Sequence, residues 1–222
     1  MNETNYEREI LIEHITAALR QRIPVDDALF DRIYPDHVQR LSRVHFTPVS
    51  VALRAAEWLA PEPGRRVLDA GAGAGKLCMV AALSHPGSWQ GVEIDPSLVA
   101  VASAAARELA VADCTSFAAG DLLALDWRAF DSLYLYNPFV AALFWRAGRS
   151  DRGPGAKYGA EYGAEYGAEY NDRVAAVRQQ LAGLAAGTRV VAFHGFGAEM
   201  PSGFARAASD RELALWIKER AM

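Results

Sequence analysis

The chain has 222 residues, of which 51% are hydrophobic, and its formal net charge at pH 7 is −4. This length and composition predict one compact α/β domain with a modest appendage. The mild acidity and the scattered arginines argue against a large nucleic-acid-binding surface, which normally shows as clustered Lys and Arg.

The first nine residues are polar and charged, and no apolar run approaches the length needed to span a membrane. We therefore expect a soluble, cytoplasmic protein without a membrane partner. Cys78 and Cys114 lie in apolar segments, which favours reduced, packed thiols over a disulfide. His, Cys and Asp are not spaced like metal ligands, so we expect no metal.

The sequence of residues 1–45 predicts helices. Ile10, Leu11, Ile15 and Leu19 recur at helical spacing and predict an amphipathic helix over residues 6–21. Shorter helices are expected around residues 25–33 and 35–41, so that residues 1–45 form a helical cap. A further helix is expected to run from Thr47-Pro48 to Pro61, with Thr47 at the N-cap and Pro48 in the first turn.

From residue 66 onward, strand and helix patterns alternate, which predicts a mostly parallel sheet with right-handed crossovers. The expected strands are residues 66–69, 89–94, 114–118, 132–136 and 189–194. The expected helices are residues 75–83, 95–110 and 172–184, the second of them capped by Asp95-Pro96. The tail is expected to close the sheet as an antiparallel hairpin around Ser209-Asp210.

A low-complexity insert, residues 153–171, separates the fourth and fifth strands. Its Tyr-Gly-Ala-Glu repeat would place Tyr158, Tyr162, Tyr166 and Tyr170 along one helical face. Each glycine costs a helix interior about 1 kcal/mol, so an isolated helix would be marginal. Two interpretations stay open: a dispensable insertion and a substrate lid.

A glycine run follows the first strand, in the segment of residues 67–76. A phosphate-binding loop ending at Gly75-Lys76 would need a glycine where Ala70 stands and a hydroxyl where Leu77 stands. The dinucleotide fingerprint would need a third glycine at Lys76 or at Cys78. Both spacings fail, and what remains is Asp-x-Gly-x-Gly-x-Gly.

This pattern resembles the first motif of the class I (Rossmann-like) S-adenosylmethionine-dependent methyltransferases, and the resemblance extends over residues 46–217. It implies a Rossmann-like seven-stranded, mostly parallel sheet with an antiparallel C-terminal hairpin in a domain of residues 46–222, and S-adenosylmethionine as the cofactor. A ligand without a pyrophosphate needs no helix terminus on a phosphate. It needs close backbone approach, which glycine permits.

By this resemblance, Asp69 lies near the methionine amino end, Glu93 takes both ribose hydroxyls, and Asp121 accepts from the adenine amino group. Ile94 and Leu122 flank the adenine ring. The segment around Phe46 and Thr47, before the first strand, lies near the ligand's carboxylate. The full set of expected cofactor residues is Phe46, Thr47, Asp69, Ala70, Gly71, Gly73, Glu93, Ile94, Asp121, Leu122 and Asn137.

The fourth strand ends in Tyr136-Asn137-Pro138-Phe139, which resembles the Asn/Asp-Pro-Pro-Tyr/Phe motif of methyltransferases acting on planar nitrogens, with one proline missing. The resemblance implies that Asn137 orients the acceptor, assisted by Tyr136, and that Pro138 and Phe139 contact the substrate. A simple turn after a buried strand is the alternative. His194, at the end of the fifth strand, is a candidate general base.

We therefore expect transfer of a methyl group to a nitrogen or oxygen of a small-molecule or protein acceptor. Nucleic acid is the less favoured acceptor, on charge alone. The alternatives are an adenine-type nucleic-acid N-methyltransferase and a cofactor-binding scaffold without turnover; an NAD-dependent dehydrogenase is more distant. The sequence leaves the acceptor and the oligomeric state open.

Overall fold

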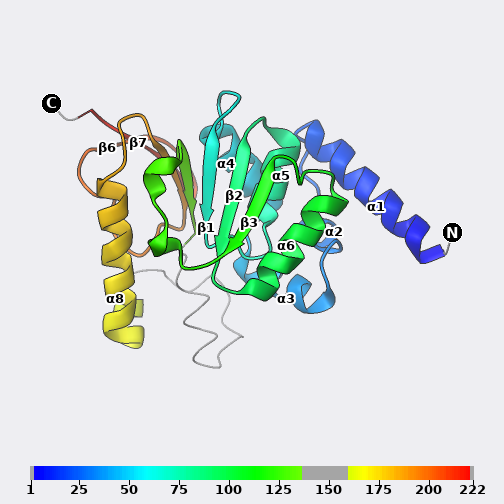
Figure 1. Cartoon of the computed structure of the whole chain (residues 1–222), viewed down its shortest axis with the longest axis horizontal. Helices are drawn as coiled ribbons and strands as arrows, with labels where there is room; N and C mark the ends of the chain where they lie inside the picture. The colour runs from blue at the N-terminus through cyan, green and yellow to red at the C-terminus, as the bar shows by residue number, and fades with distance from the viewer. Residues whose placement is uncertain (1–2, 137–159, 221–222) are drawn as a thin grey trace.

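Seven strands form one sheet in the computed structural model, which describes residues 3–136 and 160–220 (Figure 1). The strands are β1 (Arg66–Ala70), β2 (Ser88–Glu93), β3 (Thr115–Ala119), β4 (Ser132–Leu135), β5 (Arg189–Phe193), β6 (Phe204–Asp210) and β7 (Leu213–Lys218). Their spatial order is β3-β2-β1-β4-β5-β7-β6. The first five are parallel, and β7 pairs antiparallel with both β5 and β6. The predicted mostly parallel sheet with an antiparallel C-terminal hairpin is confirmed.

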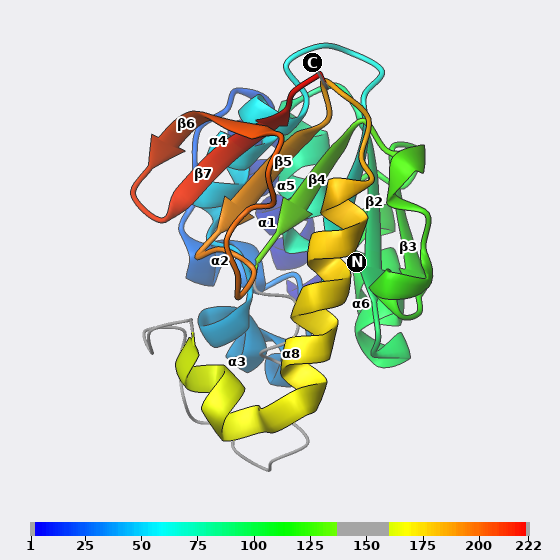
Figure 2. The same cartoon turned by 90° about the vertical axis from the view of Figure 1, so that its left-hand side faces the viewer.

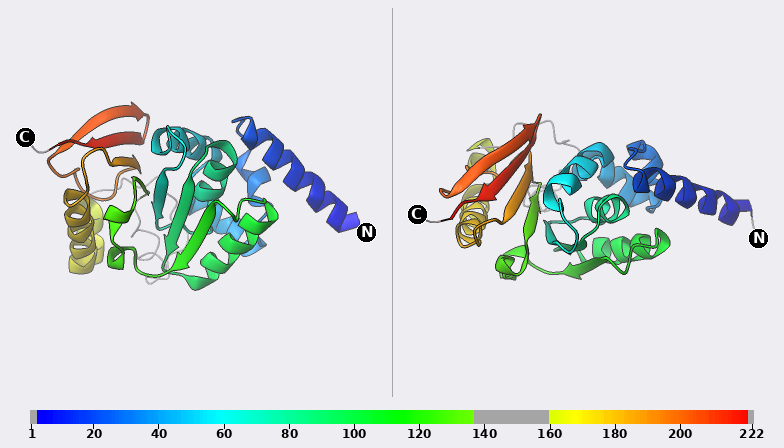
Figure 3. Two further views of the ribbon diagram at one scale, coloured as in Figure 1. Left: turned by 45° about the horizontal axis from the view of Figure 1, so that its top comes forward. Right: turned by 90° about the horizontal axis from the view of Figure 1, so that it is seen from above.

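Helices cover both faces of this sheet (Figure 3). They are α1 (Glu3–Arg20), α2 (Asp27–Asp31), α3 (Asp36–His45), α4 (Val49–Leu59), α5 (Lys76–Ser84), α6 (Pro96–Glu108) and α8 (Ala160–Ala182), with 3-10 turns η1 (Leu122–Ala124) and η2 (Trp127–Ala129). Side chains alternate between faces along a strand. Accordingly, Val67 packs in the cluster that α1–α6 cover, whereas Leu68 packs against α8, on the face turned to the viewer in Figure 2.

The N-terminal helices share their core with the sheet domain. Ile15 of α1, Phe30 of α2 and Val38 of α3 are fully buried in the cluster that also holds α4 and α5. The division of the chain at residue 45 stays a prediction. No helix in the described ranges combines the length and the apolar character that a membrane span requires.

The start of α4 differs from the expectation. Its N-cap residue is Pro48, not Thr47, and the backbone N–H of Val49 donates to the Asp27 carboxylate of α2 at 2.9 Å. The Thr47 hydroxyl is buried and instead lies 2.9 Å from the hydroxyl of Tyr134 on β4. A carboxylate from another helix therefore caps α4, which the local sequence does not reveal. By contrast, Asp95 caps α6 as predicted, through the Ser97 amide at 2.8 Å.

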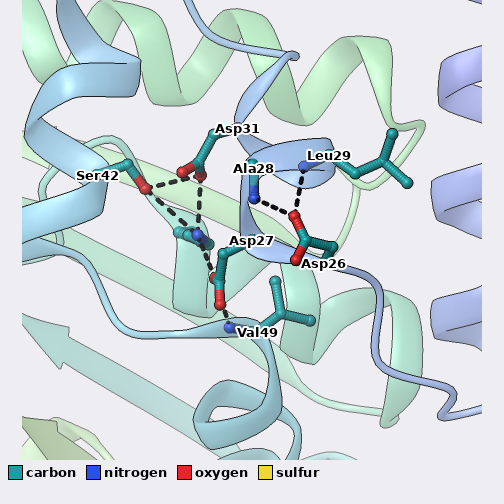
Figure 4. A network of polar contacts seen from close by, with 8 residues as sticks. Asp26, Asp27, Ala28, Leu29, Asp31, Ser42 and Val49 are labelled. Atoms are coloured by element: carbon teal, nitrogen blue, oxygen red, sulfur yellow. Dashed lines mark hydrogen bonds and ion pairs between the residues drawn. The ribbon is translucent and has the colours of Figure 1, made fainter.

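A buried lysine joins α5 to the N-terminal helices. The Lys76 ammonium, on the first residue of α5, lies 2.6 Å from Asp27 and 2.8 Å from Asp31. The Ser42 hydroxyl of α3 donates to Asp31 at 2.7 Å and lies 3.3 Å from the same ammonium. Figure 4 shows how Asp27, Asp31 and Ser42 converge from α2 and α3. The helix that follows the glycine loop is thus anchored by charge as well as by apolar packing.

Helix α8 begins inside the Tyr-Gly-Ala-Glu repeat and is longer than predicted, but it is broken at Gly167. That residue has φ 72° and ψ −155°, a conformation outside the helical region that glycine tolerates. Tyr158 lies outside the described residues. Tyr170, after the break, is buried, and its hydroxyl lies 2.2 Å from where a Cβ on Gly197 would stand. The tyrosine of the last repeat unit is therefore part of the core, whereas Gly167, Ala168 and Glu169 are exposed.

The C-terminal hairpin turns later than predicted. Strand β6 continues through Ser209 and Asp210, and the turn falls on Arg211-Glu212, where Arg211 has φ 52°. A register shift between Arg206 and Ala208 interrupts the β6–β7 pairing. The polar pair Ser209-Asp210 suits a turn by composition, but here it pairs with β7.

Candidate cofactor site

Parallel strands bring the predicted acidic residues to one edge of the sheet. Asp69 lies in β1, Glu93 ends β2, and Asp121 follows β3 after Gly120. The carboxyl ends of β1, β2 and β3 share one edge, the position where open α/β sheets bind ligands.

The glycine loop connects β1 to α5 in a conformation that needs glycine. Gly71, Gly73 and Gly75 have φ values of 86°, 55° and 76°, in the left-handed region. The amides of Gly71 and Ala72 both donate to the carbonyl of Val92 on β2, at 2.9 and 3.0 Å. The loop is therefore held against the neighbouring strand.

Phe46 covers this loop. A Cβ built on Gly73 would lie 2.8 Å from the Phe46 ring, and the ring meets Tyr34 edge-on at 6.1 Å between centroids. The structure thus brings Phe46 to the loop, as its position in the expected cofactor set requires. Thr47 lies beside it in the chain, but its hydroxyl already contacts Tyr134.

Asp69 is a buried carboxylate beside a buried thiol. Its side chain is buried in β1, and the Cys78 Sγ donates to it at 3.6 Å. Burial raises the pKa of Asp69 from its ordinary 3.8 to about 7, against the lowering effect of the Cys78 hydrogen bond and with a further rise from the charge of Glu93. Burial likewise raises the pKa of Cys78 well above its usual range. A positively charged ligand group at this point would offset the cost of burying the carboxylate.

Glu93 is held from both sides by backbone amides. The Gly73 N–H donates to Oε2 at 2.9 Å, and the Asp95 N–H donates to Oε1 at 3.1 Å. Within the described part of the chain these are the two hydrogen bonds that Glu93 accepts. A carboxylate oxygen has about two acceptor positions, so one position remains on each oxygen.

The apolar neighbours of these acids differ in exposure. Ile94 is 57% exposed directly after Glu93, whereas Leu122 is 7% exposed and packs in the core cluster with Ala70 and Val92. The carbonyl of Leu122 accepts from the Trp127 indole at 2.8 Å. An exposed isoleucine at this edge suits a ring face, while the Leu122 and Ala70 side chains face the core.

Asp121 pairs with a residue that the sequence did not single out. Arg173 of α8 donates to both carboxylate oxygens of Asp121, at 3.3 and 3.1 Å. No sequence signal marks this pair, because it depends on a crossover between segments 52 residues apart. Lys76 was also missed, although it did have one signal: it is the only charged residue of α5.

On the acceptor side, Asn137, Pro138 and Phe139 lie outside the described residues. Tyr136 and His194 do come together, with ring centroids 5.8 Å apart, and Tyr136 also packs on Phe193 at 4.8 Å. His194 has φ 54°, and its Nδ1 lies 3.5 Å from Glu212. Burial lowers the pKa of His194, and the charge and hydrogen bond of Glu212 oppose this effect. The lowered pKa favours a neutral imidazole.

No protein-family model and no curated protein matches the sequence. Several solved structures do resemble the fold. Magnesium protoporphyrin IX methyltransferase (ChlM) from Synechocystis PCC 6803, with bound SAM, gives a TM-score of 0.54 at 16% identity, over 88% of this chain and 98% of that one. TrmN from Thermus thermophilus gives 0.52 at 19% identity, over 78% of this chain.

The chain spans about half of TrmN, 49%, and 43% of the [4+2]-cyclase SpnF, whose TM-score is 0.47 at 19% identity over 65% of this chain. The structural similarity to ChlM and TrmN establishes the fold, but sequence identities this low do not establish the activity. The chain has the Rossmann-like fold of ChlM, over nearly the whole length of both proteins.

Proposed function

We propose that this chain is an S-adenosylmethionine-dependent methyltransferase that transfers a methyl group to a nitrogen or oxygen of a small-molecule or protein acceptor. The shared fold with ChlM, described with bound SAM, supports the choice of cofactor. The glycine run in the loop after the first strand agrees with it.

The geometry of Glu93 carries this proposal. One acceptor position stays open on each carboxylate oxygen, and the Gly73 and Asp95 amides fix the orientation of the group. Two adjacent acceptors at a fixed spacing suit a vicinal diol such as that of a ribose. The same group would serve poorly as a phosphate site because it is itself an anion.

The other cofactor residues fit the ligand's two ends. Asp69 supplies a buried carboxylate for the methionine ammonium, and the left-handed Gly71 and Gly73 let the backbone approach the ligand closely. Ile94, exposed after Glu93, offers an apolar face for the adenine ring, and Asp121 would accept a hydrogen bond from the adenine amino group. These residues bind and orient the cofactor.

The cofactor would supply an electrophilic methyl group on a sulfonium. The chain's part in catalysis would be to align the acceptor with that methyl group, which is mainly an effect of proximity and orientation. We assign this alignment to Asn137 and to Tyr136, and we assign substrate contact to Pro138 and Phe139. His194, favoured in its neutral form, would accept the proton that the acceptor loses.

Cofactor binding tests the proposal first. The wild-type chain should bind S-adenosylmethionine in a calorimetric titration, and Glu93→Gln should weaken binding on the order of 100-fold, since it disturbs two charge-assisted hydrogen bonds. Asp95→Asn is the matched control because it retains the backbone N–H to Glu93 and a capping side chain. No binding to the wild-type chain at millimolar cofactor would end the proposal.

Transfer from methyl-labelled cofactor then distinguishes the acceptors. Label incorporated into small carboxylates, amines or a protein pool supports the favoured acceptors, and label in RNA or DNA supports the nucleic-acid alternative. A chain that binds the cofactor yet transfers no label to any of these pools would be the scaffold without turnover. His194→Gln should lower kcat and leave cofactor affinity unchanged.

A further inference from the structure

The ion pair between Asp121 and Arg173 lies at the edge of the proposed adenine position. Arg173 presents two nitrogens of its guanidinium to the two oxygens of one carboxylate, at 3.3 and 3.1 Å. Both side chains are partly exposed, 37% for Asp121 and 29% for Arg173. Such two-point pairing fixes the plane of the carboxylate, which a single-point cation does not do.

The remaining acceptor capacity of Asp121 can be counted. Oδ1 accepts from the Leu123 amide at 3.0 Å and from Arg173, whereas Oδ2 accepts from Arg173. These are all the hydrogen bonds that Asp121 accepts from the described residues. A carboxylate has about four acceptor positions, so one remains, and it lies on Oδ2.

We propose that Arg173 is a positioning residue for nucleoside recognition: it holds Asp121 so that a single acceptor position is presented to an amino group on the base. This inference rests on the proposed function, and it adds a residue of α8 to the proposed cofactor site. An exocyclic amino group donates to that position. A carbonyl at the same place would set two acceptors against each other.

The structure also explains why the residue must be arginine. A lysine would retain the charge, but it donates as a point charge and does not fix the carboxylate plane. Without the two-point pairing with Arg173, Asp121 keeps only the hydrogen bond from the Leu123 amide, and its carboxylate can rotate about the side-chain bonds. The selectivity for an amino-bearing base should then fall, even where the affinity for the rest of the ligand survives.

The test compares two ligands on the full chain by calorimetry: S-adenosylhomocysteine and its inosine analogue, in which a carbonyl replaces the amino group. The wild-type chain should prefer the adenine ligand. Arg173→Gln should lower this preference at least about tenfold, and Arg173→Lys about threefold, as expected for disturbing a charge-assisted hydrogen bond. Arg178→Gln, an exposed arginine one turn further along α8, is the control and should keep the wild-type ratio.

An unchanged ratio in Arg173→Gln would overturn the inference, including the case in which both affinities fall together, because that result means a structural role for α8 alone. If Arg173→Gln fails to fold, an unchanged ratio in Arg173→Lys overturns it equally. Failure of the wild-type chain to bind either ligand would refute the proposed function itself, and the two failures are therefore distinguishable.

Discussion

Replacing Lys76 by Met removes the charge that neutralises Asp31, and it should destabilise the protein strongly. The Lys76 side chain is 3% exposed, and its ammonium lies 2.8 Å from the equally buried Asp31, 2.6 Å from Asp27 and 5.5 Å from the centre of the Phe30 ring. After the substitution, Asp27 can be hydrated because it is 47% exposed. Asp31 would keep one hydrogen bond, from Ser42.

The magnitude follows from the burial of the orphaned carboxylate. Removing one partner of a buried ion pair costs about 3–5 kcal/mol in the free energy of unfolding. For a chain of this size, 1 kcal/mol corresponds to about 2–4 °C, so Tm should fall by about 6–20 °C. Replacing both Lys76 and Asp31, by Met and Leu, should restore much of this loss, because buried pairs exchanged for apolar residues of similar volume are often neutral.

Thermal and urea unfolding, followed by circular dichroism, measure both variants. Arg128→Met is the matched control: it removes a surface cation that lies 2.7 Å from Asp126 with both side chains more than half exposed, and it should leave Tm unchanged. Two results would refute the reasoning. One is a Tm for Lys76→Met close to that of the wild-type chain, and the other is a double variant no more stable than the single one.

Three further predictions concern the sheet and its carboxyl edge. The pKa of Asp69 is about 7 in the folded chain against an ordinary 3.8, so between these two pH values the folded state holds a proton that the unfolded state has lost. The free energy of unfolding should therefore fall as pH rises from about 4 to about 7. Asp69→Asn should flatten this slope in urea titrations. Gly91→Ala would place a Cβ 2.6 Å from the Ala72 Cβ and 2.7 Å from the Phe117 ring, and it should cost about 1–3 kcal/mol in the same assay; an unchanged free energy of unfolding would mean that both the glycine loop and the ring can shift without cost. Ser132→Ala removes a buried hydrogen bond of 2.6 Å to the carbonyl of Leu59, and we expect a loss of about 1 kcal/mol; an unchanged midpoint of unfolding would contradict this.

Much of the fold was predictable because its signals lie in short, local stretches of sequence. The apolar strands, the Asp95-Pro96 cap and the glycine loop can each be recognised from a few consecutive residues, and parallel pairing then brings Asp69 and Glu93 to one edge of the sheet. The spacing of the glycines excluded the dinucleotide loop, and the spacing together with Leu77 in place of a hydroxyl residue excluded the phosphate-binding loop. The assignment of the individual cofactor residues stays a prediction that binding measurements must test.

The features that sequence reasoning missed all depend on contacts between distant segments. Asp27 takes over the capping role expected of Thr47 because tertiary packing brings α2 to the start of α4. Arg173 meets Asp121 across 52 residues, and nothing on α8 itself distinguishes it from its neighbour Arg178. The hairpin turn was misplaced for another reason: Ser209-Asp210 has turn composition, but pairing with β7 determines its conformation.

The order of strands in the sheet has a consequence for synthesis of the chain. Strand β7 lies between β5 and β6, although it follows both in sequence. During translation, β5 therefore exposes a row of unpaired backbone groups until residues 213–218 have left the ribosome, and β6 has no partner in the sheet before then. An open sheet edge of this kind is prone to pair with other chains. A chain that stops before Leu213 should consequently aggregate even though strands β1–β5 are complete.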